Sequence, residues 1–426
     1  MFSKRMQLRA YPVYLLMTAI YSFGFTTIAT MNIVYQAETV KLNALQLVLV
    51  GTVLEIVCFI TQIPTGIIAD IFSRRLSIII GYLLMGAGFL LEGLLPNFGA
   101  ILLAQVLWGT GSTCIDGAQE AWVVDEMGEE QAGRIFNRGS QVAQIATLLA
   151  IPVSVGLATL RLNVPVVVGA CILLLLVVVL LFVMPENHFQ RTPREERNSW
   201  QVMGHQLVSA GRFMRFSPLL ICILGVGLCM GLASEGFDRL NQPHFFQDFT
   251  FPHLWSLTPV VWFGLISFVA SVLCIGATEL VNRHVDTTKR RGLIKVLCAI
   301  DLLQIVGIVG FALAGNLYLA ALAFVLARVT RTVRSPLYST WTIQNTEPRT
   351  RATIFSALGL VDALGQIAGG PGVGYIGTLY SLRAALVATG LLLSPVIIFF
   401  TRALGLQKER TLQETLIAED GETMSV

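Results

Sequence analysis

Gly66-Ile67-Ile68-Ala69-Asp70-Ile71-Phe72-Ser73-Arg74-Arg75 is a charged loop between two long apolar runs in a chain of 426 residues. The spacing Asp-x-x-x-Arg-Arg returns in the second half of the chain, in Asp286-Thr287-Thr288-Lys289-Arg290-Arg291. This second copy again lies between apolar runs. A polar hinge that is repeated in both halves predicts a duplicated membrane unit.

The composition predicts a membrane protein with many spans. Hydrophobic residues make up 54% of the chain and charged residues 13%, with a mean hydropathy of +0.71. Soluble domains carry about 25% charged residues, and a membrane helix needs roughly 20 apolar residues. The apolar runs predict an all-α membrane protein with twelve transmembrane helices, near 11–35, 45–69, 76–94, 98–124, 135–160, 163–184, 216–240, 256–281, 292–314, 316–341, 352–378 and 381–405.

The basic residues predict the orientation of these helices. Lys and Arg are enriched in the cytoplasmic loops of membrane proteins, and most of the 29 basic residues fall in loops on one side of the predicted spans. We therefore expect a multi-pass protein of the bacterial cytoplasmic (plasma) membrane with both termini in the cytoplasm. The net charge of +3 then reflects loop asymmetry, so no nucleic-acid partner is expected.

The longest polar interruption, from Pro185 to Arg215, divides the predicted spans into two sets of six. The predicted domains are an N-terminal six-helix bundle at 1–184, a cytoplasmic linker at 185–215, a C-terminal six-helix bundle at 216–405 and a cytoplasmic tail at 406–426.

No pattern for an enzyme or a cofactor is present in the sequence. The seven cysteines fall within predicted helices and lack metal-ligand spacing. A Gly-x-x-x-x-Gly-Lys-Ser/Thr phosphate loop is missing as well. We therefore expect no metal, no cofactor and no enzymatic activity.

Further repeats support the duplication. Leu103-Ala104-Gln105-Val106 matches Leu326-Ala327-Arg328-Val329, and Arg134-Ile135-Phe136 matches Thr353-Ile354-Phe355, at nearly the same separation as the hinge. Parallel repeats related by an axis along the membrane normal are the architecture of the major facilitator superfamily, which predicts two pseudo-symmetric six-helix bundles.

The hinge itself resembles the loop signature of that superfamily, Gly-x-x-x-Asp-x-x-x-Arg-Arg/Lys, at Gly66, Asp70, Arg74 and Arg75. Ile71 and Ser73 depart from its usual basic residue and glycine. Other stretches look similar to bacterial drug-efflux branches, those of macrolide and tetracycline exporters: Pro64-Thr65-Gly66, Gly117-Ala118-Gln119-Glu120-Ala121-Trp122 and Val124-Asp125-Glu126.

The resemblance implies a role for the hinge as a cytoplasmic latch, with Asp125 at the end of the fourth span as its partner. Gly66 would let the second span pack closely against a neighbour, and Asp70 would accept hydrogen bonds from Arg74 or a helix N-terminus. The alternative is that Arg74 and the following arginine only set topology. A looser second latch is expected at Asp286, Arg290 and Arg291, where Asn282 replaces the glycine.

Four ionisable residues fall near mid-depth in the predicted spans: Glu55, Asp301, Arg328 and Asp362. A charge at the bilayer centre costs about 2.5–3.5 kcal/mol on insertion scales, so such residues mark transport pathways. Glu55 is a candidate for proton coupling, because a carboxylate can be neutralised by a proton.

Arg328, Arg331 and Arg334 share one broad face of the tenth span. They could bind an anion or a substrate. Alternatively, Arg328 pairs with Asp301 or Asp362 while Arg334 snorkels to the cytoplasm. The arginine often found in the fourth span of proton-coupled members of the resembling family would fall at Gln105, so Arg328 could have taken over that role.

Asp116 and Glu120 are four residues apart in the fourth span, which predicts a shared helix face near its cytoplasmic end. They could form an entry vestibule for protons or cations, or a solvated helix end with structural ion pairs. A substrate cavity would need aromatic and polar lining, and Tyr21, Asn32, Trp108 and Trp262 are candidates. These four could instead pack between helices or face lipid.

The sequence, together with the resemblance, predicts a secondary active transporter that exports drug-like small molecules against proton influx by alternating access. Its expected partners are a small-molecule substrate, protons and the lipid bilayer, and we expect it to function as a monomer. The alternatives are a metabolite or siderophore carrier of the same fold and a non-transporting membrane receptor.

Overall fold

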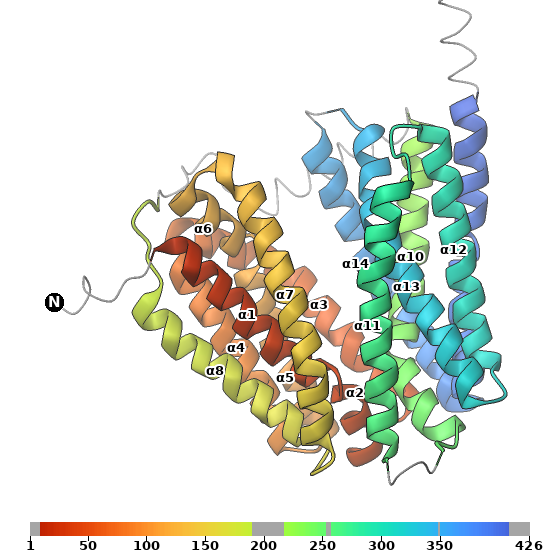
Figure 1. Cartoon of the computed structure of the whole chain (residues 1–426), viewed down its shortest axis with the longest axis horizontal. Helices are drawn as coiled ribbons and strands as arrows, with labels where there is room; N and C mark the ends of the chain where they lie inside the picture. The colour runs from red at the N-terminus through yellow and green to blue at the C-terminus, as the bar shows by residue number, and fades with distance from the viewer. Residues whose placement is uncertain (1–8, 190–216, 253–256, 348–349, 409–426) are drawn as a thin grey trace, which may run out of the picture. The chain divides into compact units, whose positions relative to one another are not determined.

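The computed structural model describes residues 9–189, 217–252, 257–347 and 350–408, and these residues are almost entirely helical (Figure 1). In the first half the helices are α1 (Ala10–Ala29), α2 (Asn32–Val34), the π-helix η1 (Tyr35–Thr39), α3 (Ala44–Ile71), α4 (Arg74–Leu94), α5 (Phe98–Ile115), α6 (Ala118–Met127), α7 (Glu129–Ala158) and α8 (Val164–Val183). In the second half they are α10 (Pro218–Asp248), α11 (Pro259–His284), α12 (Arg290–Leu313), α13 (Leu317–Gln344), α14 (Arg351–Leu379) and α15 (Leu382–Leu393).

The predicted all-α membrane fold with twelve spans is confirmed. Within the described residues, 11 helical segments are long and apolar enough to cross a membrane. The twelfth span is α13, which is 28 residues long and carries Arg328, Arg331 and Arg334, the three arginines predicted to share one face. Most of the predicted linker, the tail from residue 409 and the first eight residues lie outside the described residues. The predicted cytoplasmic location of the two termini therefore falls there too.

The fourth span is broken, which corrects one expectation. Helix α5 ends at Ile115, and α6 begins at Ala118 after a turn in which Gly117 has φ +75°. Glycine adopts this left-handed conformation without the steric penalty that a side chain would bring. The expected shared face of Asp116 and Glu120 is wrong, because no continuous helix joins them.

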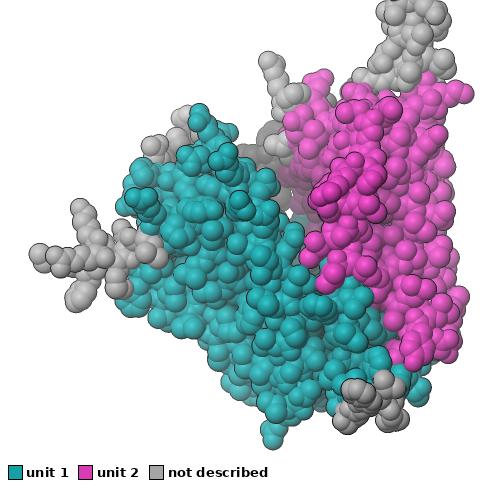
Figure 2. Space-filling model, in the orientation of Figure 1, with its two compact units in different colours: residues 1–203, 239–271, 374–382 teal, residues 204–238, 272–373, 383–426 magenta. Residues whose placement is uncertain are grey.

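The chain consists of two compact units (Figure 2). Unit 1 holds residues 1–203, 239–271 and 374–382, and unit 2 holds residues 204–238, 272–373 and 383–426. Unit 1 therefore contains the N-terminal helices together with one end of α10, one end of α11 and one end of α14. The predicted topology places these three ends on the outer side of the membrane.

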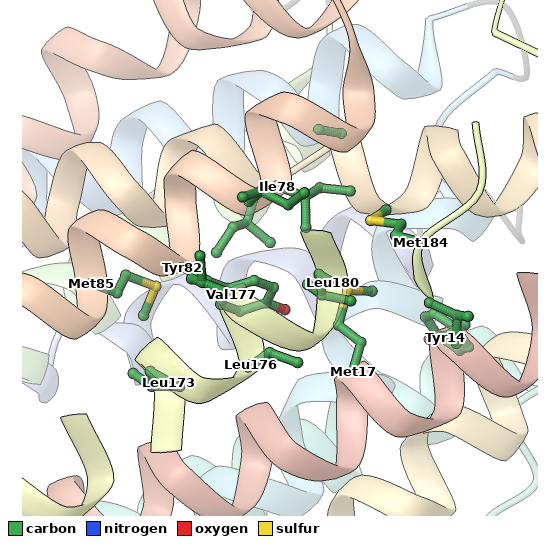
Figure 3. Close-up of a cluster of buried hydrophobic side chains, with 14 of the residues drawn as sticks. Tyr14, Met17, Ile78, Tyr82, Met85, Leu173, Leu176, Val177, Leu180 and Met184 are labelled. Carbon is green, nitrogen blue, oxygen red and sulfur yellow. The ribbon is translucent and has the colours of Figure 1, made fainter. Parts of the chain in front are cut away.

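Unit 1 has a core of buried apolar side chains from α1, α4 and α8 (Figure 3). Met17, Ile78 and Leu173 are fully buried in it. Unit 2 has a separate core in which Leu297, Trp341 and Phe400 are fully buried. Each unit therefore holds its helices together by its own apolar packing.

Glycine brings α4 and α5 into backbone contact. A Cβ atom built at Gly111 would lie 2.6 Å from the carbonyl oxygen of Gly81, and one built at Gly81 would lie 2.6 Å from the carbonyl oxygen of Gly111. Close approach of membrane helices through small residues is a common packing mode. The contact is reciprocal, so a side chain added at either glycine would meet the backbone of the other helix.

We expect Gly111→Ala to destabilise the protein by about 1–3 kcal/mol, because the added methyl group would force α4 and α5 apart. Thermal unfolding of the purified protein in detergent micelles measures this loss. Gly133→Ala is the matched control, since a Cβ at Gly133 on α7 meets nothing within 4 Å. Alanine favours a helix over glycine by up to about 1 kcal/mol, so this control should leave stability unchanged or raise it. Equal melting temperatures for the two variants would contradict the packing account.

Candidate functional site

A polar cavity of about 250 Å³ lies within unit 2, among α10, α12, α13 and α14. We call it the α13 cavity, because its two arginines come from that helix. Apolar side chains such as Phe237 and Met230 line it together with polar ones. The charged and amide groups of its lining are Arg331, Arg334, Asp362, Gln304 and Gln366.

Arg334 forms a buried ion pair with Asp301 of α12. Its Nε atom donates a hydrogen bond of 3.1 Å to Oδ2 of Asp301 and lies 2.9 Å from Oδ1. The side chains are 8% and 0% exposed. The guanidinium also lies 4.5 Å from the ring centroid of Tyr338, in cation–π contact. One carboxylate and one aromatic face therefore offset the cost of burying the charge of Arg334.

Arg331 lies one turn earlier on α13 and forms a more open pair. Its Nη1 atom is 2.5 Å from Oδ1 of Asp238 on α10, and the side chains are 39% and 45% exposed. On the opposite wall, Gln366 donates a hydrogen bond of 2.8 Å to Asp362. Both arginines act electrostatically on the Asp362 carboxylate. Charges of both signs therefore meet at the cavity.

Two buried polar atoms of the cavity lining have no hydrogen-bond partner among the described residues. They are Nη2 of Arg334, a donor, and Oε1 of Gln304, an acceptor. Gln304 is 5% exposed. Buried polar groups are rarely left unpaired in folded proteins. The two atoms could be satisfied by one ligand group that both accepts and donates hydrogen bonds, such as a hydroxyl or an amide.

The expected pairing of Arg328 with Asp301 is wrong. Asp301 pairs with Arg334, while Arg328 is exposed and lies 5.7 Å from the ring centroid of Phe324. Arg334 therefore does not snorkel to the cytoplasm, because a carboxylate on the neighbouring helix holds it inside unit 2.

The hinge between α3 and α4 lies in unit 1, where Arg74 and Asp125 form an ion pair of 2.5 Å. The side chains are 14% and 23% exposed. Sequence reasoning overlooked a second acid, Glu186. It accepts hydrogen bonds of 2.6 Å from the Ser73 hydroxyl and 3.0 Å from the Arg75 backbone N–H. A carboxylate is favourable at this N-terminus of α4. The role of the hinge as a latch stays a prediction.

Two local expectations for the hinge are wrong. A Cβ atom at Gly66 would meet no atom within 4 Å, so Gly66 makes no close helix contact in the described structure. Asp70 is half-buried at the end of α3 and has no hydrogen-bond or ion-pair partner among the described residues. Asp70 lacks the expected hydrogen bond from Arg74 because the Arg74 side chain pairs with Asp125 on α6 instead.

The second copy of the hinge is organised differently from the first. The hydroxyl and the backbone N–H of Thr288 donate hydrogen bonds of 2.5 and 3.0 Å to Asp286. These hydrogen bonds, together with Lys289 at 3.4 Å, lower the pKa of the Asp286 carboxyl from its ordinary value. Arg290 and Arg291 form no ion pair with any described residue. Gln344 of α13 donates a hydrogen bond of 2.6 Å to the Thr287 carbonyl oxygen, so this turn is tied to α13 through its backbone.

These observations can be set beside known proteins. A sequence profile of the Major Facilitator Superfamily matches residues 14–369. The chain belongs to the Major Facilitator Superfamily. It is therefore a multi-pass membrane protein of a transporter family and not an enzyme. The uncharacterized MFS-type transporter YxaM of Bacillus subtilis (strain 168) is 24% identical over 367 residues, which cover 83% of this chain and 86% of that protein.

Solved structures of transporters share the fold. The nucleoside transporter NupG has a TM-score of 0.74 and 15% identity, covering 94% of this chain and 100% of that one. A bacterial homolog to the human lysosomal transporter Spinster, in an inward-facing and unoccupied conformation, has a TM-score of 0.72 and 15% identity, covering 94% and 98%. At these identities the likeness shows the major facilitator fold.

The other predicted coupling residues are not part of the lining of the α13 cavity. Glu55 is half-buried on α3 in unit 1. Asp116 is exposed in the break between α5 and α6, and Glu120 is exposed on α6. Among the predicted coupling residues, only Asp362 lines the cavity. The roles of Glu55, Asp116, Glu120 and Arg328 in coupling stay predictions.

The four predicted cavity residues do not line the α13 cavity either. In unit 1, Tyr21 packs 5.4 Å from the ring of Tyr82, and Trp108 packs 5.0 Å from the ring of Phe89. Trp262 donates a hydrogen bond of 3.1 Å to the carbonyl oxygen of Pro252. The fourth residue, Asn32, is buried beside a carboxylate that sequence reasoning overlooked, Glu92.

We expect a double-mutant cycle of Arg74→Ala and Asp125→Ala to show a coupling free energy of about 1–3 kcal/mol, because contacting residues in one ion pair are not additive. Chemical unfolding of the purified single and double variants measures it. The matched control is Arg283 and Glu279 on α11, a pair of the same 2.5 Å separation but 71% and 57% exposed. Its coupling should stay below about 1 kcal/mol. Similar coupling free energies in both pairs would contradict the expectation that burial strengthens the ion pair of Arg74 and Asp125.

Proposed function

We propose that this chain is a secondary active transporter that exports drug-like small molecules against proton influx by alternating access. It would act as a monomer in the bacterial cytoplasmic membrane, with both termini in the cytoplasm. The observation that carries the proposal is the α13 cavity, where apolar side chains and unpaired polar atoms occur together.

The lining of this cavity suits an amphipathic ligand. Phe237 and Met230 offer apolar contact, while Arg334 and Gln304 each offer one unsatisfied polar atom. Ligand sites are mostly apolar with a few placed polar groups and usually enclose about 300–1,000 Å³. Because the cavity encloses about 250 Å³, it would hold one polar portion of a drug-sized substrate.

Proton coupling is assigned to the acidic residues, with Asp362 as the candidate in the cavity and Glu55, Asp116 and Glu120 as candidates in unit 1. Arg328 stays a candidate partner for these acids. One proton for each substrate nearly suffices at a membrane potential of about 100 mV, and a modest pH gradient closes the gap. One charge that moves across 100 mV releases about 2.3 kcal/mol, against about 2.7 kcal/mol for a hundredfold gradient of a neutral solute.

The polarity of the cavity favours a second candidate function, the transport of a polar metabolite. Two arginines and a carboxylate line the cavity, and a hydroxylated or amide-bearing metabolite would satisfy both unpaired atoms. This carrier would use the same site with a smaller substrate.

Accumulation of ethidium and of a panel of hydroxylated metabolites in cells tests the proposal. Cells that express the wild type should accumulate less ethidium than cells that express Asp362→Asn, and a proton uncoupler should abolish the difference. Glu55→Gln tests the candidate in unit 1 in the same way. Efflux that persists with the uncoupler would defeat proton coupling. A response confined to the metabolites would select the second candidate, and no response to any compound would defeat both.

A further inference from the structure

Glu92 is a carboxylate in unit 1 that the hinge and the α13 cavity do not use. It lies on α4 close to the outer end of that helix and is 0% exposed. Gln36 of η1 donates a hydrogen bond of 2.6 Å to Oε1, and Gln105 of α5 donates one of 3.4 Å to Oε2. Asn32 of α2 also hydrogen-bonds to this carboxylate. Three amide side chains from three elements therefore surround one buried acid.

One charged group faces this acid from the second half of the chain. Arg239 of α10, which is 8% exposed and belongs to the same unit, acts electrostatically on Glu92. Among the described residues, Tyr35 is a second titratable neighbour, and its hydroxyl donates a hydrogen bond of 2.9 Å to the backbone carbonyl of Glu92. A buried carboxylate is costly unless it is paired or protonated. The state of Glu92 is thus tied to the position of Arg239.

The amide groups around Glu92 can serve both of its protonation states. The carbonyl oxygens of Asn32, Gln36 and Gln105 are all buried and lack a hydrogen-bond partner in the described structure. An amide donates to an ionised carboxylate through its nitrogen and, after rotation by half a turn, accepts from a protonated one through its oxygen. The three unpaired oxygens are therefore ready acceptors for the O–H of a neutral Glu92.

The same region joins the first half of the chain to the ends of α10 and α14 in unit 1. Gln242 of α10 accepts a hydrogen bond of 3.1 Å from the Val34 backbone N–H. Thr378 of α14 accepts one of 2.9 Å from the Leu45 backbone N–H. The π-helix η1 lies between these contacts and presents Gln36 to Glu92. Single-turn π segments occur frequently at functional sites. We call this set of contacts the outer seam.

We propose that Glu92 is a proton-binding residue whose charge controls the outer seam. The proposal rests on the proton-coupled transport proposed above and adds to it the residue that links a proton to this contact. An ionised Glu92 attracts Arg239 of α10 and accepts the hydrogen bond of Gln36 from η1. When a proton from the outer solution binds, Glu92 loses its charge and donates its O–H to an amide oxygen. The attraction to Arg239 is then lost and the hydrogen bond of Gln36 rearranges, which loosens the outer seam.

Hydrogen exchange of the full-length protein in lipid nanodiscs tests this proposal without a substrate. Peptides from η1 through the start of α3 and from the end of α10 are followed across pH, with correction for the intrinsic pH dependence of exchange. In the wild type we expect the outer seam to exchange at least tenfold faster at acidic pH than at alkaline pH. Glu92→Gln should give fast exchange at every pH, because glutamine mimics the protonated acid.

A control variant separates Glu92 from a titratable pair at this end of α10, His244 and Asp248. His244 is fully buried and its Nδ1 atom lies 2.5 Å from Asp248. His244→Gln should keep the pH dependence of the wild type. If His244→Gln abolishes the pH dependence while Glu92→Gln keeps it, the proposal is overturned. A wild-type seam whose exchange does not depend on pH would overturn it as well.

A second variant covers the case in which Glu92→Gln does not fold. Glu92→Asp keeps a carboxylate at the same place and should retain a pH-dependent seam with a shifted midpoint. An unshifted midpoint would count against Glu92 as the titrating group. Failure of proton-driven efflux with an intact pH-dependent seam would defeat the proposed function and leave Glu92 as a pH-responsive group, so the two failures can be told apart.

Discussion

Asp301→Ala is expected to lower the free energy of unfolding by about 3–5 kcal/mol, because it leaves the buried guanidinium of Arg334 without its counter-charge. The pair is nearly inaccessible to solvent, with side chains 8% and 0% exposed. Replacing both partners by apolar residues of similar size, as in Asp301→Leu with Arg334→Met, should recover most of the loss. Unfolding of the purified protein in mixed micelles measures the wild type and both variants.

The control for this prediction is the more open pair one turn away. Asp238→Ala removes the partner of Arg331, and both side chains of that pair are more than one third exposed. The loss of stability should stay below about 1 kcal/mol. If Asp301→Ala and Asp238→Ala destabilise the protein equally, burial does not decide the cost of the unpaired arginine. The explanation that the Arg334 pair is costly to break because it is buried would then be wrong.

Arg331→Gln is expected to reduce transport at least tenfold while it leaves stability within about 1 kcal/mol of the wild type. Arg331 lines the α13 cavity and acts electrostatically on the carboxylate of Asp362, which belongs to α14. Hydrogen bonds to charged groups contribute about 1.5–3 kcal/mol, and each 1.4 kcal/mol corresponds to about a factor of ten. Initial rates of ethidium efflux, normalised to the amount of folded protein, measure the effect.

Lys295→Gln is the matched control for transport. Lys295 is an exposed basic residue of α12 in the same unit and does not line the cavity. Its substitution should leave the rate of efflux within about a factor of two, since surface charges rarely contribute more than about 0.5 kcal/mol. A loss of transport that is equal in both variants would point to a general effect of charge and would contradict a specific role for the cavity.

The sequence predicted the membrane class and the number of spans, because apolar runs of this length have few alternatives. It also predicted that Arg74 and Asp125 would lie together, on the basis of a resemblance to the family. Helix contacts of single residues were harder to predict. Gly66 was expected at a tight contact, yet the reciprocal contact is made by Gly81 and Gly111 on α4 and α5.

The pairing of charges could not be read from spacing alone. The sequence places Arg328, Arg331 and Arg334 on one broad face, but the rotation of α13 against α10 and α12 decides which acid each arginine meets. Asp238 was overlooked because it lies near the end of a predicted span. In the structure, α10 continues to Asp248, so Asp238 lies well inside the helix.

Glu92 was overlooked for a similar reason. It lies close to the end of α4, where a carboxylate is ordinarily read as solvated. Its burial comes from residues distant in sequence, namely Gln36 of η1, Gln105 of α5 and Arg239 of α10. No pattern within α4 indicates this environment. The break at Gly117 was equally hidden, since a single glycine within an apolar run is compatible with a continuous helix.

In the proposed function, one chain exchanges a small molecule for protons through the α13 cavity. The most direct test is the internal pH of liposomes that contain the purified protein, measured with an enclosed pH-sensitive dye after ethidium is placed on one side. We expect proton movement opposite to ethidium that depends on the protein and is lost in Arg331→Gln and Asp362→Asn. Ethidium movement without any change in internal pH, or a pH change that is equal in these two variants and the wild type, would contradict the account.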